Sequence, residues 1–342
     1  MQRLLIIRFS SLGDLVLTEP IVRALRHAYP RAELHFLTKL QHQHLLTLIP
    51  GLDRIHPWQP ESQESLLSDL RSLHLDGVID LHNNLRSHYV TRTLGVPVYR
   101  TRKEWFCRVA AVRLKSFGRR TPSHAVDRYA AALSPLHLSL PDPPSPCLSV
   151  PPENEAWWTR ERVFRNLTGK YMIFAAGAAH ATKQAPPELW QRIHASMARE
   201  RDRKLILLGA PSERALLHSL ADSLGTATVI AEPHICDAAA VLKSAEFVIS
   251  NDSGVAHLAA ALDTPTLSLF GPTHPVLGFA PLGNFADHYT VNEYCSPCSL
   301  HGKRRCHRDE RFCFNRMADN VISERIKVLL DKKNAAAASR RL

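Results

Sequence analysis

The sequence lacks a hydrophobic run long enough to cross a bilayer, for which about 20 consecutive apolar residues are needed. We expect no secretory signal at the N-terminus, because Arg8 and Asp14 interrupt the apolar stretch that such a signal requires. No Gly-x-Gly-x-x-Gly fingerprint follows a predicted strand, which disfavours a nicotinamide-binding dehydrogenase. Walker A loops and recognisable nucleic-acid-binding modules are absent as well. We therefore expect a cytoplasmic protein outside these classes.

The composition is that of an ordinary folded protein, with 342 residues, 45% hydrophobic and 22% charged. This length is comfortable for two domains. Seven cysteines without a secretory signal argue against a framework of disulfides.

Positive charge is concentrated in one segment of a chain whose net charge is +11. Between residues 86 and 120, ten basic residues face a single acidic one, Glu104; they are Arg86, Arg92, Arg100, Arg102, Lys103, Arg108, Arg113, Lys115, Arg119 and Arg120. Such a segment suits a polyanionic partner, whether nucleic acid, an anionic membrane surface or a phosphorylated or acidic substrate. A solvated basic face is the alternative.

Short apolar runs alternate with helical patterns in both halves of the chain, which predicts α/β domains with parallel, doubly wound sheets. Residues 141–152 hold six prolines in twelve positions and predict a semi-rigid linker. We expect one domain over residues 1–150 and a second over 151–330. The last residues, 331–342, are expected to form a frayed, flexible tail.

The first candidate motif follows the predicted strand "LLIIRF". A turn of Ser10, Ser11, Leu12 and Gly13 leads into a helix near Asp14, at the sheet edge where parallel sheets bind ligands. Gly13 would allow a ligand to approach the backbone closely. Asp14 would either project into the crevice or serve as an ordinary helix cap.

Two further motifs follow strands in the second half. The small-residue loop before Lys183 could hold a diphosphate through backbone N–H groups and the lysine, or Lys183 could be solvated beside the loop. Glu213, just past "LILLGA", could accept hydrogen bonds from ribose hydroxyls or occupy a favourable helix-dipole position.

The fourth motif is "NDSGVAHLAA", which follows the strand "EFVIS". Asp252 and Ser253 precede Gly254, whose missing side chain lets an oxygen reach the free N–H groups of a helix start. His257 lies three residues further on. The alternatives are a well-capped connection and a phosphate site.

The extended segment "NDSGVAHLAAALDTPTLSLFGPT" closely resembles the donor-binding signature of glycosyltransferase family nine, the ADP-heptose:lipopolysaccharide heptosyltransferases. The opening "LLIIRFSSLGDLVLTEP", "IDLHNNLRS", the loop around Lys183 and "LLGAPSE" are similar to the same family, over about residues 1–330. The resemblance implies a GT-B fold, with two Rossmann-like doubly wound domains facing across a cleft. The acceptor side would be N-terminal and the donor side C-terminal.

The resemblance implies roles for particular residues. Asp14 would be the general base, and the donor-binding residues would be Thr182, Lys183, Glu213, Asp252, Ser253, Gly254 and His257. On the acceptor side we place Ser10, Ser11, Gly13, Arg86, Arg100, Arg102 and Lys103. One departure is Ala178-Ala179, where relatives often carry hydroxyl residues that bind phosphate. Either Thr182 would substitute for them or the contact would be made by the backbone alone.

The implied activity is inverting transfer of heptose from ADP-L-glycero-D-manno-heptose to the lipopolysaccharide inner core, either Kdo-lipid A or a heptosylated core. No cofactor would be required for catalysis. The expected partners are ADP-heptose, the anionic lipopolysaccharide acceptor and the inner-leaflet surface, on whose cytoplasmic face the protein would lie peripherally. A transferase for another nucleotide sugar and a non-catalytic polyanion binder are the alternatives. No nucleic-acid partner is expected, because aromatic residues do not interleave the basic segment.

Four cysteines cluster near the end of the second domain at Cys295, Cys298, Cys306 and Cys313. Four thiols within this span can close a tetrahedral zinc site. A structural zinc ion, reduced thiols and a disulfide all remain open.

Overall fold

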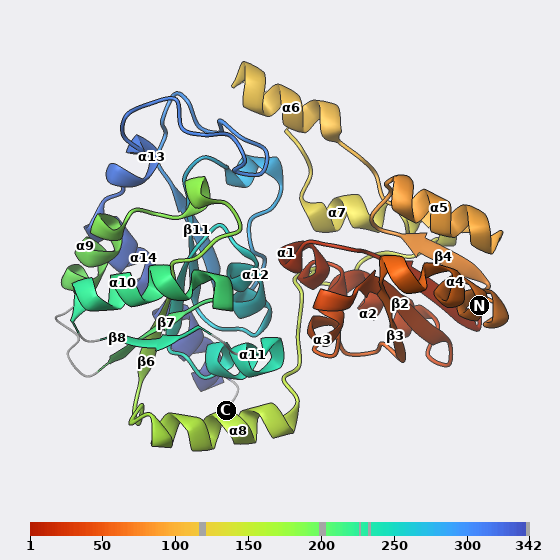
Figure 1. The fold of residues 1–342 in the computed structure, drawn as a ribbon, viewed down its shortest axis with the longest axis horizontal. Helices are drawn as coiled ribbons and strands as arrows, with labels where there is room; N and C mark the ends of the chain where they lie inside the picture. Colours follow the sequence, from red (N-terminus) through yellow and green to blue (C-terminus); the bar gives the residue numbers. More distant parts are fainter. Residues whose placement is uncertain (116–120, 198–202, 226, 232–233, 340–342) are drawn as a thin grey trace. The chain divides into compact units, whose positions relative to one another are not determined.

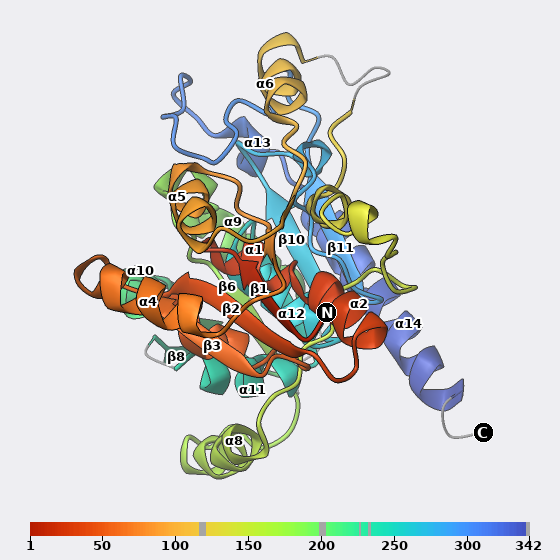
Figure 2. The ribbon, with the colours of Figure 1, turned by 90° about the vertical axis from the view of Figure 1, so that its right-hand side faces the viewer.

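The computed structural model describes residues 1–115, 121–197, 203–225, 227–231 and 234–339. Its contacts divide the chain into two units, each with one parallel sheet (Figures 1 and 2). Unit 1 comprises Met1–Glu104 and Ser123–Ser149, and unit 2 comprises Trp105–Pro122 and Val150–Leu342. The sequence-based boundary near residue 150 assigns Trp105–Pro122 to the N-terminal domain. Their contacts group them with unit 2 instead. Part of the basic segment therefore lies outside the N-terminal unit.

Unit 1 is built on five parallel strands in the order β3-β2-β1-β4-β5. The strands are β1 (Arg3–Ile7), β2 (Glu33–Lys39), β3 (Arg54–Trp58), β4 (Gly77–Asp80) and β5 (Val98–Arg100). Its helices are α1 (Leu12–Val16), α2 (Glu19–Ala28), α3 (Gln43–Leu46), α4 (Gln63–Ser72), α5 (Leu85–Leu94) and α7 (Ala125–Ala130). The strand order reverses between β1 and β4, and ligands of open α/β sheets bind at the carboxyl ends of the strands at such a switch point.

Unit 2 has six parallel strands in the order β11-β10-β9-β6-β7-β8, with its switch point between β6 and β9. The strands are β6 (Tyr171–Ala175), β7 (Lys204–Leu208), β8 (Ala227–Ile230), β9 (Phe247–Asn251), β10 (Thr266–Phe270) and β11 (Ala286–Thr290). Its helices are α6 (Trp105–Leu114), α8 (Pro152–Phe164), α9 (Pro187–Met197), α10 (Arg214–Leu224), α11 (Ile235–Lys243), α12 (Gly254–Ala261), α13 (Phe312–Asn315) and α14 (Asp319–Ser339).

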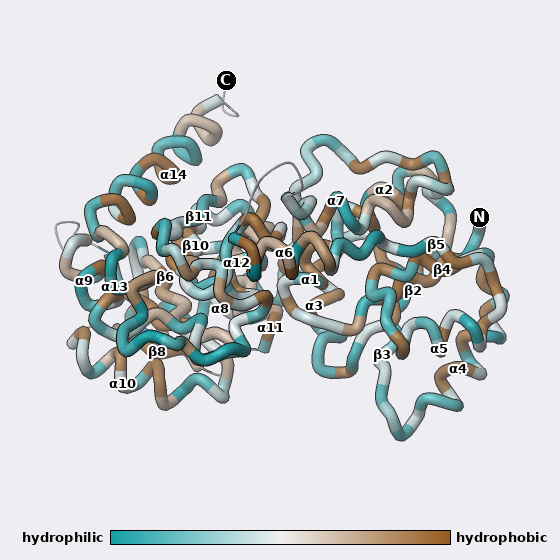
Figure 3. The backbone as a smooth tube through the Cα atoms, turned by 90° about the horizontal axis from the view of Figure 1, so that it is seen from above, coloured by the Kyte–Doolittle hydropathy of each residue, from teal (hydrophilic) through white to brown (hydrophobic). Residues whose placement is uncertain are grey.

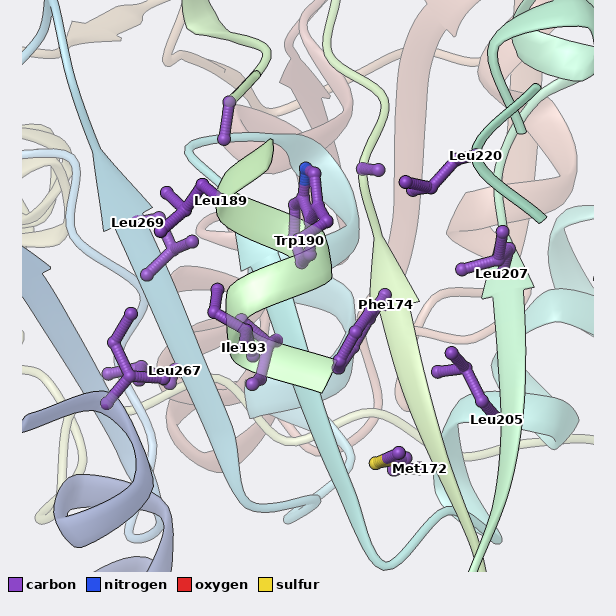
Figure 4. Packing of buried hydrophobic residues seen from close by; sticks show 14 of the residues in the cluster. Met172, Phe174, Leu189, Trp190, Ile193, Leu205, Leu207, Leu220, Leu267 and Leu269 are labelled. Atoms are coloured by element: carbon purple, nitrogen blue, oxygen red, sulfur yellow. The ribbon is translucent and has the colours of Figure 1, made fainter. Parts of the chain in front are cut away.

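The central strands form because their residues are apolar on both faces, as a sheet covered by helices on both sides requires. Every residue of β6 is buried, and so is every residue of β10. Helix α9 presents Trp190 and Ile193 to this sheet, and the Trp190 ring lies 5.1 Å from that of Phe174 (Figure 4). The hydropathy colouring of Figure 3 shows apolar residues recurring along these central strands.

Several elements differ from the sequence-based prediction. Strand β3 was not predicted; it contains Pro57 and lies at a sheet edge, where a missing N–H is tolerated. The segment "HLLTLIPGL", whose apolar spacing predicts a helix, forms only part of the single turn of α3, since Pro50 and Gly51 follow. Residues 331–339, predicted to be frayed, are helical in α14 because their alanines are strong helix formers. Residues 340–342 lie outside the described part of the chain.

Candidate functional site

The unit 1 site is centred on Asp14, in the first turn of α1 beyond the carboxyl end of β1. Its Oδ2 accepts hydrogen bonds from the Ser11 amide (3.0 Å) and hydroxyl (2.7 Å). Its Oδ1 accepts the Tyr129 hydroxyl at 2.9 Å and lies 2.7 Å from Arg8 Nη2. Asp14 therefore caps its own helix and also forms an ion pair with Arg8, so the capping interpretation describes its contacts in this structure. The role as general base stays a prediction.

Burial by itself would raise the pKa of Asp14, but the Arg8 charge and the hydrogen bonds from Ser11 and Tyr129 outweigh it and lower that pKa. Burial chiefly raises the pKa of Tyr129, which keeps its hydroxyl protonated as a donor. The site thus holds an ionised carboxylate at every physiological pH.

His82 belongs to this site, although the sequence analysis did not single it out. Its ring packs edge-on against Phe9, with centroids 5.3 Å apart. Burial, followed by the Arg8 charge, lowers the His82 pKa to about 4, so the ring is neutral at physiological pH. The Nδ1 atom is buried and has no hydrogen-bond partner among the described residues. The sequence signal was a histidine two residues past Asp80, at the end of the strand next to β1.

Asp80 organises the loop that begins α5. It is fully buried and accepts hydrogen bonds from the His82 and Asn83 amides and from the Ser87 hydroxyl. Arg100 Nε lies 3.6 Å from its carboxylate. Arg100, predicted as an acceptor contact, is therefore engaged in holding this loop.

The other residues predicted to bind the acceptor differ in their contacts. The Arg86 guanidinium lies over the Phe9 ring at 5.3 Å, and the charges of Arg86 and Lys103 both help to lower the His82 pKa. Ser10 accepts a hydrogen bond from Arg8 through its carbonyl, and Gly13 is buried within α1. Arg102 is exposed, and its amide donates to the Arg128 carbonyl.

In unit 2, Lys183 and Asp252 meet at the switch point. Lys183 lies in the loop after β6, Asp252 follows β9, and their Nζ and Oδ2 atoms are 2.6 Å apart. The Thr273 hydroxyl, missed in the sequence analysis, donates to the same oxygen at 2.6 Å. Its signal was the Gly-Pro-Thr turn after β10. The lysine is thus fixed at the place where parallel sheets bind ligands.

Helix α12 begins beside this pair. Ser253 precedes its first residue, Gly254, and makes no side-chain cap; its hydroxyl is 3.0 Å from that of Ser250. Asn251 ties the two switch-point loops together, because its amide donates to the Ala176 carbonyl and accepts from the Ala185 N–H. The start of α12 therefore lacks a side-chain cap, and helix starts of this kind can bind anions. His257 is buried one turn further along.

Glu213 extends from the start of α10 toward the loop after β6. A Cβ built on Gly177 would lie 2.1 Å from the Glu213 carboxyl carbon, so only glycine leaves room for this carboxylate. Its Oε2 accepts the Ala210 N–H at 2.9 Å. Thr182 donates its hydroxyl to the Gly302 carbonyl, which indicates a role in fixing the loop rather than a free hydroxyl in this structure.

The four clustered cysteines line one small cavity together with His307. All are free thiols, and burial followed by neighbouring thiols raises the pKa of Cys313 to about 12. Among the described residues, no three His, Cys, Asp or Glu side chains are arranged as metal ligands. The four thiols therefore line the same cavity, but their arrangement in this structure is not that of a metal-coordination shell.

Two parallel, doubly wound units, each with polar residues at its switch point, are the architecture of the GT-B glycosyltransferases. A profile of glycosyltransferase family 9 (heptosyltransferase) matches residues 64–307, and the chain belongs to this family. It is therefore a glycosyltransferase of the heptosyltransferase type, which confirms the resemblance and the predicted fold class.

Individual relatives agree with this assignment. The chain is 26% identical to lipopolysaccharide heptosyltransferase 1 of Pseudomonas aeruginosa, over 96% of this chain and 98% of that protein. Its fold is similar to E. coli ADP-heptose lipopolysaccharide heptosyltransferase II, with a TM-score of 0.76, 20% identity and coverage of 98% and 100% of the two chains. It is also similar to an E. coli heptosyltransferase solved with ADP, with a TM-score of 0.68, 21% identity and coverage of 96% and 100%.

Proposed function

We propose that this protein transfers heptose from ADP-L-glycero-D-manno-heptose to the lipopolysaccharide inner core, with inversion at the anomeric carbon. The observation that carries the proposal is the Lys183–Asp252 pair at the start of α12, on the switch point of a sheet in a heptosyltransferase family member. A lysine and free helix N–H groups at this place suit a nucleotide diphosphate.

The donor would bind to unit 2. Lys183 and the first N–H groups of α12 would contact the diphosphate, with Asp252 orienting the lysine through their 2.6 Å contact. Glu213 would accept hydrogen bonds from the ribose hydroxyls. Ser253, Gly254 and His257 would complete the wall around the diphosphate and sugar.

In the reaction, an acceptor hydroxyl oxygen would bond to the anomeric carbon while the bond from that carbon to the diphosphate oxygen breaks. The electron pair of the broken bond leaves with ADP, and the hydroxyl proton passes to Asp14. Fixed cations and helix N–H groups stabilise the negative charge that builds on the diphosphate, without a metal ion. Proton removal by a positioned base contributes typically about 10²–10⁴-fold in rate.

The lowered pKa of Asp14 limits how it can act as a general base. The carboxylate is always ionised, but it is a weak base while Arg8 and Tyr129 hold Oδ1. It can orient the attacking hydroxyl by accepting its hydrogen bond, and it can take the proton once that hydroxyl has become acidic through bond formation. Arg86 and Lys103, near His82, would bind acidic groups of the acceptor.

Two assays test the proposal. Thermal shift with ADP, UDP and NAD should show stabilisation selective for ADP. Stabilisation by UDP would support a transferase for another nucleotide sugar, and no response to any nucleotide would favour the non-catalytic polyanion binder. Transfer assays with Kdo2-lipid A and its heptosylated forms would then identify the acceptor.

We also propose that the protein acts peripherally on the cytoplasmic face of the inner membrane, where a lipid-linked acceptor would be reached. No helix among the described residues is long and apolar enough to span a membrane. The structural zinc stays a prediction that elemental analysis of the purified protein tests. Zinc retained by the native chain and lost in a Cys298→Ser/Cys313→Ser variant would support it, and native protein without metal would exclude it.

A further inference from the structure

Helix α6 belongs by its contacts to unit 2, beside the segment that precedes α13 (Figures 1 and 2). One side of the helix makes these contacts. The Arg108 guanidinium lies 4.7 Å from the Phe279 ring centroid, Ala111 is buried, and Lys115 just beyond the helix donates to the Cys295 carbonyl at 2.9 Å. Positions 108, 111 and 115 follow the spacing of one helix face, so α6 has a defined inner side.

The opposite side of α6 is apolar and exposed. Phe106 and Arg113 are seven residues apart and lie on the side opposite Arg108 and Ala111, while Trp105 and Leu114 lie on the two flanks of the helix. Trp105 is 54% exposed, Phe106 81% and Leu114 72%. The Trp105 and Phe106 rings contact each other edge to face at 5.0 Å. Trp105 and Phe106 therefore form an exposed aromatic pair at the start of the helix, and Leu114 is exposed near its end. Exposed apolar groups of this size mark interaction sites.

The charged residue on the outer side of α6 is basic. It is Arg113; the other basic residues between Trp105 and Lys115, Arg108 and Lys115, make the inner contacts, and this stretch contains no acidic residue. Helix α8 offers a contrast within the same unit. It also exposes an apolar pair, Val163 and Phe164, but it carries three glutamates against two arginines.

We propose that the exposed surface of α6, formed by Phe106 and Arg113 with Trp105 and Leu114 on its flanks, docks on an anionic phospholipid surface. Exposed aromatic and aliphatic side chains beside a basic one are suited to the boundary between headgroups and acyl chains. Tryptophan is favoured there because its ring is apolar and its N–H is polar. Arg113 would meet the lipid phosphates, an attraction worth about fivefold in binding for each cation near an anionic surface.

The biological purpose of this docking rests on the proposed function, because an enzyme with a lipid-linked acceptor must reach that acceptor at a membrane. The test of membrane binding does not depend on the proposed function. Full-length protein is co-sedimented with vesicles of phosphatidylglycerol and phosphatidylcholine, and separately with vesicles of phosphatidylcholine alone, without donor or acceptor.

We expect the native protein to bind the anionic vesicles and to release them as salt rises, because the charges are exposed. Trp105→Ser/Phe106→Ser should weaken this binding about tenfold or more, since the two largest apolar groups are lost. Arg113→Ser should weaken it about fivefold. The matched control is Phe164→Ser, which removes an equally exposed phenylalanine from α8 and should bind as the native chain does.

Three results would overturn the proposal: no binding of native protein to anionic vesicles, equal binding by the α6 double variant, or a loss confined to Phe164→Ser. Light scattering tests the alternative that a second copy of this chain binds the exposed surface of α6. If native protein self-associates and the double variant becomes monomeric without changed vesicle binding, the patch is an interface between copies and not a membrane surface.

The thermal midpoint and ADP affinity should be the same in the double variant, because these side chains lie on the exposed side of α6. With a water-soluble acceptor its turnover should match the native rate, and only transfer to a membrane-embedded acceptor should fall. Failure of transfer with every acceptor would refute the proposed function and leave the vesicle result standing.

Discussion

Arg8 Nη2 lies 2.7 Å from Asp14 Oδ1, and both side chains are largely buried beyond the end of β1. The arginine also donates to the Leu81 carbonyl at 2.6 Å, at the neighbouring strand β4. This one guanidinium therefore joins the two loops of the unit 1 switch point and fixes the charge state of the proposed base.

Replacing Arg8 by glutamine should raise the pKa of Asp14, because burial would then outweigh the remaining hydrogen bonds. In the native enzyme Asp14 stays ionised as the pH is lowered, so its protonation does not reduce kcat/KM at mildly acidic pH. In Arg8→Gln the carboxylate becomes protonated at a higher pH, and kcat/KM should therefore begin to fall at a higher pH than in the native enzyme. A pH profile that superimposes on the native one would argue against Asp14 as the base.

The same variant should lose stability. Breaking a largely buried ion pair costs about 3–5 kcal/mol. Because the folded-state pKa of Asp14 is depressed, this stability is present above the unfolded pKa and is lost as pH falls toward the folded one. Chemical denaturation at neutral and acidic pH measures the difference. The control is Arg3→Gln, whose pair with Glu33 is nearly half exposed and should matter little.

Lys183→Met keeps the length of the side chain and removes its charge. The affinity for ADP-heptose should fall about 10–100-fold, the usual cost of losing a hydrogen bond to a charged group. Isothermal titration calorimetry with ADP and with ADP-heptose measures the change in affinity. Lys170→Met is a matched control, because Lys170 also pairs with a carboxylate, Glu246 at 3.1 Å, but does so on the surface. Equal affinity in both variants would remove Lys183 from the donor site.

Gly177→Ala should displace the Glu213 carboxylate, into which its Cβ would project. We expect ADP affinity to drop by about tenfold, with the affinity for free pyrophosphate unchanged, because only the ribose contact is lost. Glu213→Gln should show the same selectivity. Glu188→Gln, on the exposed first turn of α9, serves as the control. If pyrophosphate binding falls in parallel, Glu213 does not contact the ribose.

The fold class could be predicted from the sequence because buried parallel strands are largely apolar runs, as in all of β6 and the first three residues of β9. The missed strands are polar or short. Strand β11 has no fully buried residue, and β5 is only three residues long, so neither shows that pattern. The grouping of α6 with unit 2 depends on contacts such as Lys115 to Cys295, across 180 residues, which no local pattern reveals.

The candidate site was partly predictable for the same reason. Parallel strands end at one edge, so Asp14, Lys183, Glu213 and Asp252 could be placed at the carboxyl ends of strands from the sequence order alone. The partners that set their chemistry could not. Tyr129 reaches Asp14 from 115 residues away, and Thr273 reaches Asp252 from the turn after another strand. These contacts depend on tertiary packing.

The most direct test of the account is a single-turnover assay of Asp14→Asn with ADP-heptose and a Kdo2-lipid A acceptor, followed by mass spectrometry. The substitution keeps the shape of the side chain and removes its charge. We predict native protein that adds one heptose, and a variant that binds ADP-heptose with unchanged affinity but transfers it about 10²–10⁴-fold more slowly. A variant that transfers heptose at the native rate, or native protein that adds none, would contradict it.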